Sequence, residues 1–237
     1  MEKLEKGLEK DYPKISVPPG NLSLIISKVS FSYPDSEKIF YGQSLQLKKL
    51  RSLAVIGENG CGKSTLTALI SGMEKPHDGD IEIKIDGHWP SMVYLPQLPE
   101  RFFGGNTPEE VVNMILSEGL DSDEFIDNIT SSLASFQIPW SRISKSPIHL
   151  LSLSEARIIL IVILSHAKYE LLILDEPMFS LGIEQRRKMI EYIGVLLLKK
   201  YLIFVTHEEM EATALSELSL VISNGTINTR STIRTHA

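Results

Sequence analysis

The sequence predicts an α/β protein whose core is a mostly parallel sheet with helices on both faces. Strand-like and helix-like segments alternate along most of the chain, as they do in proteins built from parallel sheets. Several of the strand-like segments are apolar almost throughout, which is typical of strands buried on both sides. A block of helical segments, at about residues 99–166, interrupts this alternation. The length of 237 residues allows one large domain with a sizeable core.

The part of the chain before the helical block is expected to be rich in strands. Residues 22–33 alternate between apolar and polar side chains and are expected to form an edge strand. Residues 44–57 are expected to form a pair of strands, the second of them strongly apolar. A helix is expected at 66–73, after a glycine-rich turn. Two further strands are expected, at 79–87 and 91–97.

The block itself is expected to contain helices at 107–116, 123–136 and 154–167. In the first, Thr107 lies three residues before Glu110, and Pro108 occupies the first helical position. This spacing is typical of a capped helix start.

After the block the alternation resumes and completes the predicted sheet. The sequence favours a strand at 171–177, a helix at 183–200, a strand at 201–207 and a helix at 208–218. A closing hairpin is expected at 219–227 around an Asn-Gly turn.

Composition and the chain ends narrow the possible function classes. The formal net charge of −6 argues against nucleic acid as the main partner, because binding a phosphate backbone usually needs a basic face. The single cysteine excludes an internal disulfide and a cysteine-based zinc site.

The two ends of the chain are expected to lie outside the domain. Residues 1–21 are expected to form a mobile polar leader or a partner-binding arm, and residues 228–237 are expected to form a tail.

A membrane role, if there is one, is expected to be peripheral. The charged first residues predict no signal peptide. No apolar run approaches the roughly 20 residues that a membrane span needs, and the longest, 158–164, is expected to be a buried helix.

The segment GENGCGKST, residues 57–65, matches the P-loop pattern G-x-x-x-x-G-K-[ST]. It follows an apolar strand and opens a helix, which is the context that this motif requires. Backbone N–H groups and the helix N-terminus would bind phosphates, Lys63 would add a positive charge, and Ser64 would ligate Mg²⁺. Cys61 is expected to be a small spacer rather than a nucleophile. The candidate ATP-binding residues in this segment are Gly57, Asn59, Gly60, Cys61, Gly62, Lys63, Ser64 and Thr65.

Polar residues at the ends of apolar strands complete a candidate catalytic site. Asp175 ends one strand and is expected to hold Mg²⁺ through water, while the next residue, Glu176, would activate an attacking water. A positioned carboxylate base contributes roughly 10²–10⁴-fold to a rate. His207 ends another strand and would hydrogen-bond the γ-phosphate. Gln97 could reach either Mg²⁺ or the water, and the ring of Tyr33 would stack on adenine.

The order of these motifs resembles that of the ATP-binding cassette (ABC) ATPases over roughly residues 22–227. The resemblance rests on Tyr33, the P-loop, Gln97, and the segments LSLSE, LLILDEP and VTH. It implies a P-loop NTPase fold of the ABC type, with an N-terminal antiparallel β subdomain and an inserted α-helical subdomain. It also implies an ATPase that uses Mg²⁺, pairs head-to-tail with a second cassette and drives integral membrane subunits from the inner, cytoplasmic face of the cell membrane.

A finer resemblance links the chain to the energy-coupling-factor and cobalt-type importer ATPases. The segments SYPDSEKIF and QLPERFFGGNTPEEVV are similar to the corresponding segments of those proteins, which energise uptake of vitamins or transition-metal ions. By this resemblance, Gln97 and the following helices form the surface that docks on membrane subunits. Phe102 and Phe103 are either contacts there or packing residues. The residues that fit the outline are Phe102, Phe103, Gly104, Thr107, Glu109 and Val111.

Three departures from the family pattern set the main hypothesis. The signature L-S-G-G-[QE] has Leu153 and Ser154 in place of its glycines; Met178 replaces a threonine; and Gly182 replaces an aspartate. In the family, this signature completes the partner's ATP site. A leucine side chain would stand where backbone must approach the γ-phosphate. We therefore expect a heterodimer with one competent and one impaired site, rather than a homodimer. The signature residues expected to act on the partner are Ser152, Leu153, Ser154 and Glu155.

Two other functions fit the motifs less well. A non-transport ABC ATPase of DNA repair or translation would usually have coiled-coil insertions or a second fused cassette, and this chain shows neither. A regulatory subunit that binds ATP but scarcely hydrolyses it is favoured by the altered signature and disfavoured by Glu176 and His207.

Overall fold

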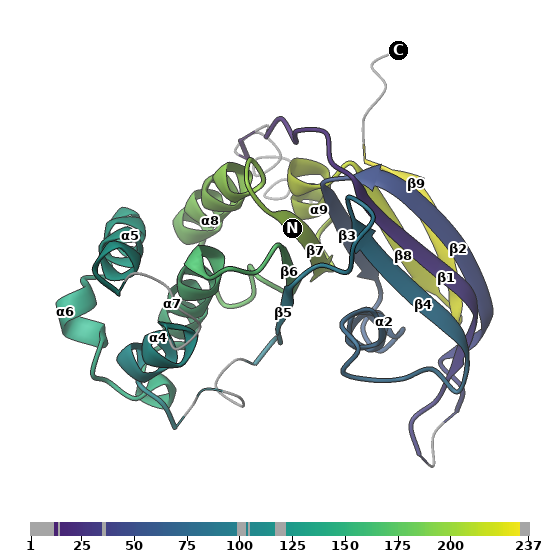
Figure 1. Ribbon diagram of the computed structural model, residues 1–237, viewed down its shortest axis with the longest axis horizontal. Coiled ribbons are helices and arrows are strands. Elements are labelled where there is room, and N and C mark those ends of the chain that lie inside the picture. The colour runs from purple at the N-terminus through teal and green to yellow at the C-terminus, as the bar shows by residue number, and fades with distance from the viewer. Residues whose placement is uncertain are drawn as a thin grey trace, which may run out of the picture.

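Two sheets and a group of helices make up the protein (Figure 1). The computed structural model describes residues 12–13, 15–34, 37–98, 103, 105–116 and 122–232. A three-stranded antiparallel sheet has the order β2-β1-β4, and a six-stranded sheet has the order β5-β6-β7-β3-β8-β9. The predicted α/β class, with its mostly parallel core sheet, β subdomain and helical insertion, is confirmed.

The antiparallel sheet is built from segments that are distant in the sequence. Its strands are β1 (Leu22–Phe31), β2 (Phe40–Leu50) and β4 (Asp78–Ile85). The prediction that the first strand lies at an edge is wrong, because β1 pairs with β2 on one side and with β4 on the other. The alternation of β1 reflects one buried face and one more open face, a pattern that a central strand of an antiparallel sheet can also show.

The six-stranded sheet is parallel from β5 to β8, and only its last strand, β9, is antiparallel. The two strands expected at 44–57 separate into different sheets, since β3 pairs with β7 and β8 whereas β2 pairs with β1. The strands of this sheet are β3 (Ser52–Gly57), β5 (Met92–Leu95), β6 (Leu171–Asp175), β7 (Tyr201–Thr206), β8 (Leu218–Ser223) and β9 (Thr226–Ser231).

Two hydrophobic clusters cover opposite faces of this sheet. In β3, Leu53 and Val55 belong to the cluster shared with the antiparallel sheet and α2, whereas Ala54 and Ile56 belong to the cluster under the other helices. Alternate residues of one buried strand therefore face two cores, which explains why the strand is apolar throughout.

The helices largely follow the sequence expectations. Thr107 Oγ1 accepts from the Glu110 amide at 3.2 Å and the Glu110 carboxylate accepts from the Thr107 amide at 2.7 Å, which confirms the predicted cap. The expected buried run, 158–164, lies in α7. The short α6 and η1 were not expected. The helices are α2 (Lys63–Ile70), α4 (Pro108–Leu116), α5 (Ser122–Ser135), α6 (Trp140–Ile143), the 3₁₀ helix η1 (Ile148–Leu150), α7 (Leu153–His166), α8 (Ile183–Leu196) and α9 (Glu209–Leu215).

The described chain ends contact the body of the protein. Within the expected leader, Ile15 and Val17 pack against the core under the helices, and the Asn21 amide donates to the Tyr201 hydroxyl at 3.3 Å. At the other end, β9 continues to Ser231, three residues past the expected start of the tail at 228. Phe103 packs against the core, while Phe102 and Gly104 lie outside the described residues.

Candidate nucleotide-binding site

The P-loop connects the end of β3 to the start of α2, and close packing around it explains two of its glycines. A β-carbon on Gly57 would lie 2.5 Å from the carbonyl oxygen of Ile222 in the neighbouring strand. Gly62 has a φ of +104° and leaves no room either, since a β-carbon there would lie 2.6 Å from Ile39 Cγ2. Both positions therefore need glycine.

Lys63 is the first residue of α2, and its side chain folds back over the loop. Its ammonium group donates to the carbonyl oxygens of Gly57 and Glu58, each at 2.9 Å. The residue is buried, with only 6% of its surface exposed. The positive charge is thus held at the mouth of the loop, next to the N-terminus of α2, where an anion is favoured.

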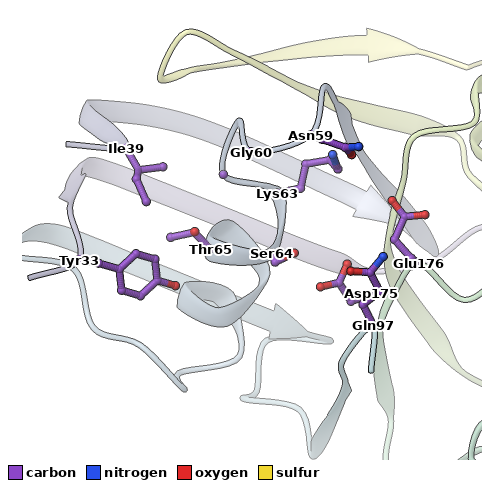
Figure 2. A pocket seen from close by; sticks show the side chains of 11 residues that line it. Tyr33, Ile39, Asn59, Gly60, Lys63, Ser64, Thr65, Gln97, Asp175 and Glu176 are labelled. Atoms are coloured by element: carbon purple, nitrogen blue, oxygen red, sulfur yellow. The ribbon is translucent and has the colours of Figure 1, made fainter. Parts of the chain in front are cut away.

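A cavity of about 490 Å³ opens beside the P-loop. Figure 2 shows Lys63 and Ser64 between the ring of Tyr33 at one end and Gln97, Asp175 and Glu176 at the other. Ten of the sequence-predicted site residues line this cavity: Tyr33, Asn59, Gly60, Gly62, Lys63, Ser64, Thr65, Gln97, Asp175 and Glu176.

The cavity also includes a residue that was not predicted, and it leaves out three predicted residues, Gly57, Cys61 and His207. Ile39, which precedes β2, lines the cavity at the same end as Tyr33 and adds an apolar side chain there (Figure 2). Gly57 and Cys61 are not among the lining residues described, and Cys61 packs instead against the core shared by the two sheets. This position agrees with the prediction that Cys61 is a spacer. Tyr33 is 39% exposed, and its ring meets Phe31 edge-on at 5.0 Å.

Asp175 ends β6 at the carboxyl edge of the parallel strands, where ligands commonly bind. It is buried, and one carboxylate oxygen accepts from the Tyr94 hydroxyl at 3.1 Å. The pKa of Tyr94 is raised far above its ordinary value. Burial of the phenol is the larger cause, and the negative charge of Asp175 is the second. The phenol therefore stays protonated and orients the carboxylate as a hydrogen-bond donor.

Glu176 follows the strand in a strained backbone conformation and contacts His207. Its φ is +50°, which costs a non-glycine residue of order 1–3 kcal/mol. Its two carboxylate oxygens lie 2.9 and 3.0 Å from Nδ1 of His207 at the end of β7. His207 does not line the cavity itself but meets it through Glu176.

Arg157 is a residue that the sequence reasoning missed. It lies on α7 in the middle of an apolar run and is only 1% exposed. Its guanidinium donates to the carbonyl oxygens of Gln97 and Glu176, and it lies 5.4 Å from the ring centre of Phe179. One buried cation therefore fixes the backbone of two residues that line the same end of the cavity. The available signal was its charge, since arginine is rarely buried without such partners.

The signature residues lie apart from this cavity. Ser152 caps α7 by accepting from the Glu155 amide at 3.2 Å, and Glu155 forms an ion pair with Arg142. Burial acts to raise the pKa of Glu155, but hydrogen bonds from Arg142 and Ser152 bring it below its usual range. Leu153 is 45% exposed. None of Ser152, Leu153, Ser154 and Glu155 is among the described residues that line the cavity.

The donor set fits a magnesium nucleotide better than a metal held by protein alone. Among the described residues, no group of three or more His, Cys, Asp or Glu side chains could hold a metal ion. Among the lining residues, Asp175, Ser64 and Gln97 can provide a carboxylate, a hydroxyl and an amide oxygen as ligands. Mg²⁺ commonly takes one or two protein oxygens and completes its shell with water and substrate phosphates. The glycine-lined loop and Lys63 provide the matching phosphate cradle.

Comparison with known proteins identifies the family. The family model described as ABC transporter matches residues 40–179, more than half of the chain. The chain therefore belongs to the ABC transporter ATP-binding family, as the motif order predicted. In the part of the chain that the structure describes, no helix combines the length and apolar character needed to cross a membrane.

Individual relatives agree with the finer resemblance. The chain is 26% identical to the cobalt import ATP-binding protein CbiO of Rhodobacter capsulatus, over 86% of this chain and 76% of that protein. It is 25% identical to the molybdate import ATP-binding protein MolC of Haemophilus influenzae, over 86% and 80%. The fold matches that of cbiO1 from Clostridium perfringens, part of the complex cbiONQ, with a TM-score of 0.70, 21% identity and coverage of 90% and 89%.

Some relatives are longer than this chain. The match spans 66% of an ABC transporter ATP-binding relative from Nostoc sp., at 28% identity, and 47% of one from Clostridium tetani, at 29% identity. What the whole relatives do is therefore carried to this chain only as a proposal.

Proposed function

We propose that this chain binds and hydrolyses Mg-ATP to energise a membrane transporter. The observation that carries the proposal is the cavity, which gathers the P-loop, Gln97, Asp175 and Glu176 around one space, with His207 in contact with Glu176. The match to the ABC transporter family supports the proposal. As a cassette without a membrane span among its described helices, the chain would act from the cytoplasmic face of the cell membrane.

Each lining residue has a proposed role in ATP binding. Tyr33 and Ile39 hold the adenine ring between an aromatic and an aliphatic side chain. The P-loop amides and Lys63 bind the phosphates, and the contacts of Lys63 with Gly57 and Glu58 oxygens are exchanged for phosphate oxygens. Ser64, Gln97 and Asp175 hold Mg²⁺, which when bound neutralises charge on the phosphates.

The hydrolytic step would rest on Glu176 and His207. Glu176 accepts the proton of the attacking water and is a general base. His207 holds the carboxylate of Glu176 in place and can donate a hydrogen bond toward the γ-phosphate. Because phosphoryl transfer depends mainly on positioning and electrostatics, Lys63, Gln97 and His207 stabilise the charge that develops.

The proposed transport role is uptake of a vitamin or transition-metal ion through an energy-coupling-factor-type complex. It is supported by relatives named for cobalt import and for the energy-coupling factor transporter. The partners would be integral membrane subunits and a second cassette, with no nucleic acid. Gln97 and the helices that follow it, α4 and α5, would form the docking surface on the membrane subunits.

We propose that the cassette dimer is a heterodimer with two unequal sites. This chain's own P-loop site has its full set of side chains, and a partner with an intact signature would complete it. The site completed by Leu153 and Ser154 would be impaired, because Leu153 stands partly exposed at the first turn of α7 where the family has glycine. The same observation favours a second candidate, a regulatory subunit that binds ATP with little turnover.

Titration of the purified chain with Mg-ATP, followed by calorimetry, tests the binding part of this proposal. Saturable binding that needs Mg²⁺ and is lost in Lys63→Ala is expected. Lys188→Ala is the matched control, because Lys188 pairs with Glu184 on the surface of α8. Absence of binding by the wild-type chain would refute the proposed function.

Isolation of the native complex tests the proposed role in transport. Membrane subunits are expected to co-purify with the chain. Co-purification of nucleic acid or ribosomes in their place would contradict the transport role.

A further inference from the structure

We propose that Glu211 is a positioning residue for His207 and that it links His207 to the loop at residues 179–182. The inference rests on the proposed function, since His207 is taken as a member of the hydrolytic site. Glu211 touches neither the cavity nor the reacting atoms. It acts through the hydrogen bonds and ion pairs of its neighbours.

The first link is the contact between Glu211 and Thr206, the residue before His207. Glu211 lies on α9 and is only 2% exposed. Its carboxylate accepts from the Thr206 hydroxyl at 2.6 Å, and the same hydroxyl accepts from the Glu208 amide at 3.0 Å. The Thr206 hydroxyl is therefore bound to two residues that follow His207, and these contacts span the histidine. The turn that carries the imidazole is fixed between the end of β7 and the start of α9.

The second link runs from Glu211 to the loop before α8. Arg186, on the first turns of α8, has its guanidinium 3.7 Å from the Glu211 carboxylate and 3.9 Å from that of Glu208. Its Nε donates to the carbonyl oxygen of Leu181 at 3.2 Å. Leu181 belongs to the loop that follows Glu176 and carries the glycine in place of the family's aspartate. Arg186 thus joins that loop to the buried carboxylate.

Together these contacts form a closed circuit around the candidate base. One path leads from Glu176 along the backbone to Leu181, then through Arg186, Glu211 and Thr206 to His207. The circuit is closed by the contact between His207 Nδ1 and the Glu176 carboxylate, at 2.9 Å. A buried carboxylate is costly unless it is paired and hydrogen-bonded. At Glu211 the two contacts that set the position of His207 offset only part of that cost.

The chain also places its own N-terminal segment on this circuit. The Tyr12 hydroxyl accepts a hydrogen bond from Arg186 and interacts electrostatically with the carboxylates of Glu211 and Glu208. The charged and titratable groups around Glu211 are therefore Arg186 from α8, Glu208 beside α9, Glu176 after β6, and Tyr12. All of them lie on segments other than the P-loop, so changes at Glu211 are expected to leave nucleotide affinity nearly intact.

The test compares Glu211→Leu and Thr206→Val, which break one contact from its two ends. The first readout is the pH titration of the His207 imidazole, followed by NMR in the full chain without nucleotide. Both variants are expected to shift the His207 titration and chemical shifts in the same way, and the double variant is expected to add little. Glu209→Leu is the matched control, because Glu209 lies on α9 but pairs with Arg230.

The second readout separates ATP binding from turnover in the complex with the partner cassette. Glu211→Leu is expected to lower kcat by about tenfold or more while KM for ATP changes less than about twofold. Thr206→Ser keeps the hydroxyl and is expected to retain wild-type behaviour, which separates loss of the contact from a general folding defect. An unchanged His207 titration in both Glu211→Leu and Thr206→Val would overturn the proposal.

The two proposals can fail separately. If the wild-type complex shows no turnover above a Glu176→Gln blank, the proposed function fails. The imidazole titration needs no turnover, so it still decides whether Glu211 positions His207.

Discussion

His207 Nδ1 lies 2.9 and 3.0 Å from the two carboxylate oxygens of Glu176. The contact joins the ends of two neighbouring parallel strands, β6 and β7. It occurs where the backbone of Glu176 is strained and its carbonyl oxygen accepts from the buried Arg157. Strain that is maintained by several surrounding contacts is common at functional sites. The relationship leads to the first prediction.

Glu176→Gln is expected to lower ATP turnover by about 10²–10⁴-fold, because an amide cannot accept the proton of the attacking water. Binding of Mg-ATP is expected to persist, since the P-loop contacts are unaltered. Phosphate release and calorimetric ATP binding, measured on the same preparation, check both parts. Glu209→Gln, on the exposed side of α9, is the control and is expected to retain turnover. A Glu176→Gln variant with full turnover would remove Glu176 from the catalytic site.

Restoring the signature glycines is the second prediction. Leu153→Gly combined with Ser154→Gly is expected to raise turnover at the partner's site, because backbone can then approach the γ-phosphate. The cost to α7 is expected to be about 1 kcal/mol per glycine, so a small fall in Tm accompanies the gain. Turnover is measured in the two-cassette complex whose other site carries the Glu176→Gln change. Leu150→Gly, next to the signature and 71% exposed, is the control, and equal turnover in wild type and double variant would contradict the prediction.

The third prediction concerns the slot that Gly194 leaves for Ile15. A β-carbon at Gly194 would lie 2.6 Å from Cδ1, 2.9 Å from Cγ2 and 3.0 Å from Cγ1 of Ile15. Glycine inside a helix costs up to about 1 kcal/mol relative to alanine, yet Gly194→Ala is expected to lower Tm because the whole Ile15 side chain must move.

The matched variant is Ile15→Ala. In that background Gly194→Ala is expected to raise Tm instead, since the clash is gone and the helix gains. A Gly194→Ala change that is stabilising in both backgrounds would show that the N-terminal segment does not occupy the slot.

The fourth prediction is a pH dependence of stability that originates at Glu211. Burial raises the pKa of Glu211 to about 7 in the folded protein, while an unfolded glutamate has its ordinary pKa of 4.5. Between these values the folded state binds more protons than the unfolded state, so Glu211 lowers stability as pH rises. The loss is complete above the folded pKa and amounts to about 3 kcal/mol.

Glu211→Gln mimics the protonated form and is expected to remove this loss. The variant should match the wild type near pH 5 and exceed its free energy of unfolding near pH 8. Urea unfolding at several pH values measures the difference. A difference between the two proteins that stays constant with pH would show that Glu211 is ionised in the folded state much as it is in the unfolded state.

Local motifs were predictable from the sequence, whereas long-range pairing was not. The P-loop, Gln97, Asp175 and Glu176 were identified because each joins a fixed residue pattern to the end of an apolar strand. The central position of β1 could not be read from its own residues. It depends on β4, which pairs with it from more than fifty residues away, Leu22 with Ile85.

Buried charged residues were the other feature that could not be predicted from the sequence. Arg157 and Glu211 lie on helices whose neighbouring residues read as core or surface, and their partners are backbone groups or side chains from other segments. The positions of these two residues can be inferred only when it is known that β5, β6 and β7 lie side by side. Ile39 was missed because an apolar residue before a strand has no pattern that points to a ligand.

The most direct test of unequal sites is ATP turnover by the purified chain alone and mixed with candidate partner cassettes, with Glu176→Gln as the blank. Near-zero turnover alone, with recovery when one partner is added, is the predicted result, because the partner's signature would then complete this chain's P-loop site. Ordinary turnover by the chain alone, in an ATP-dependent homodimer, would show that Leu153 and Ser154 are tolerated and would contradict the heterodimer account.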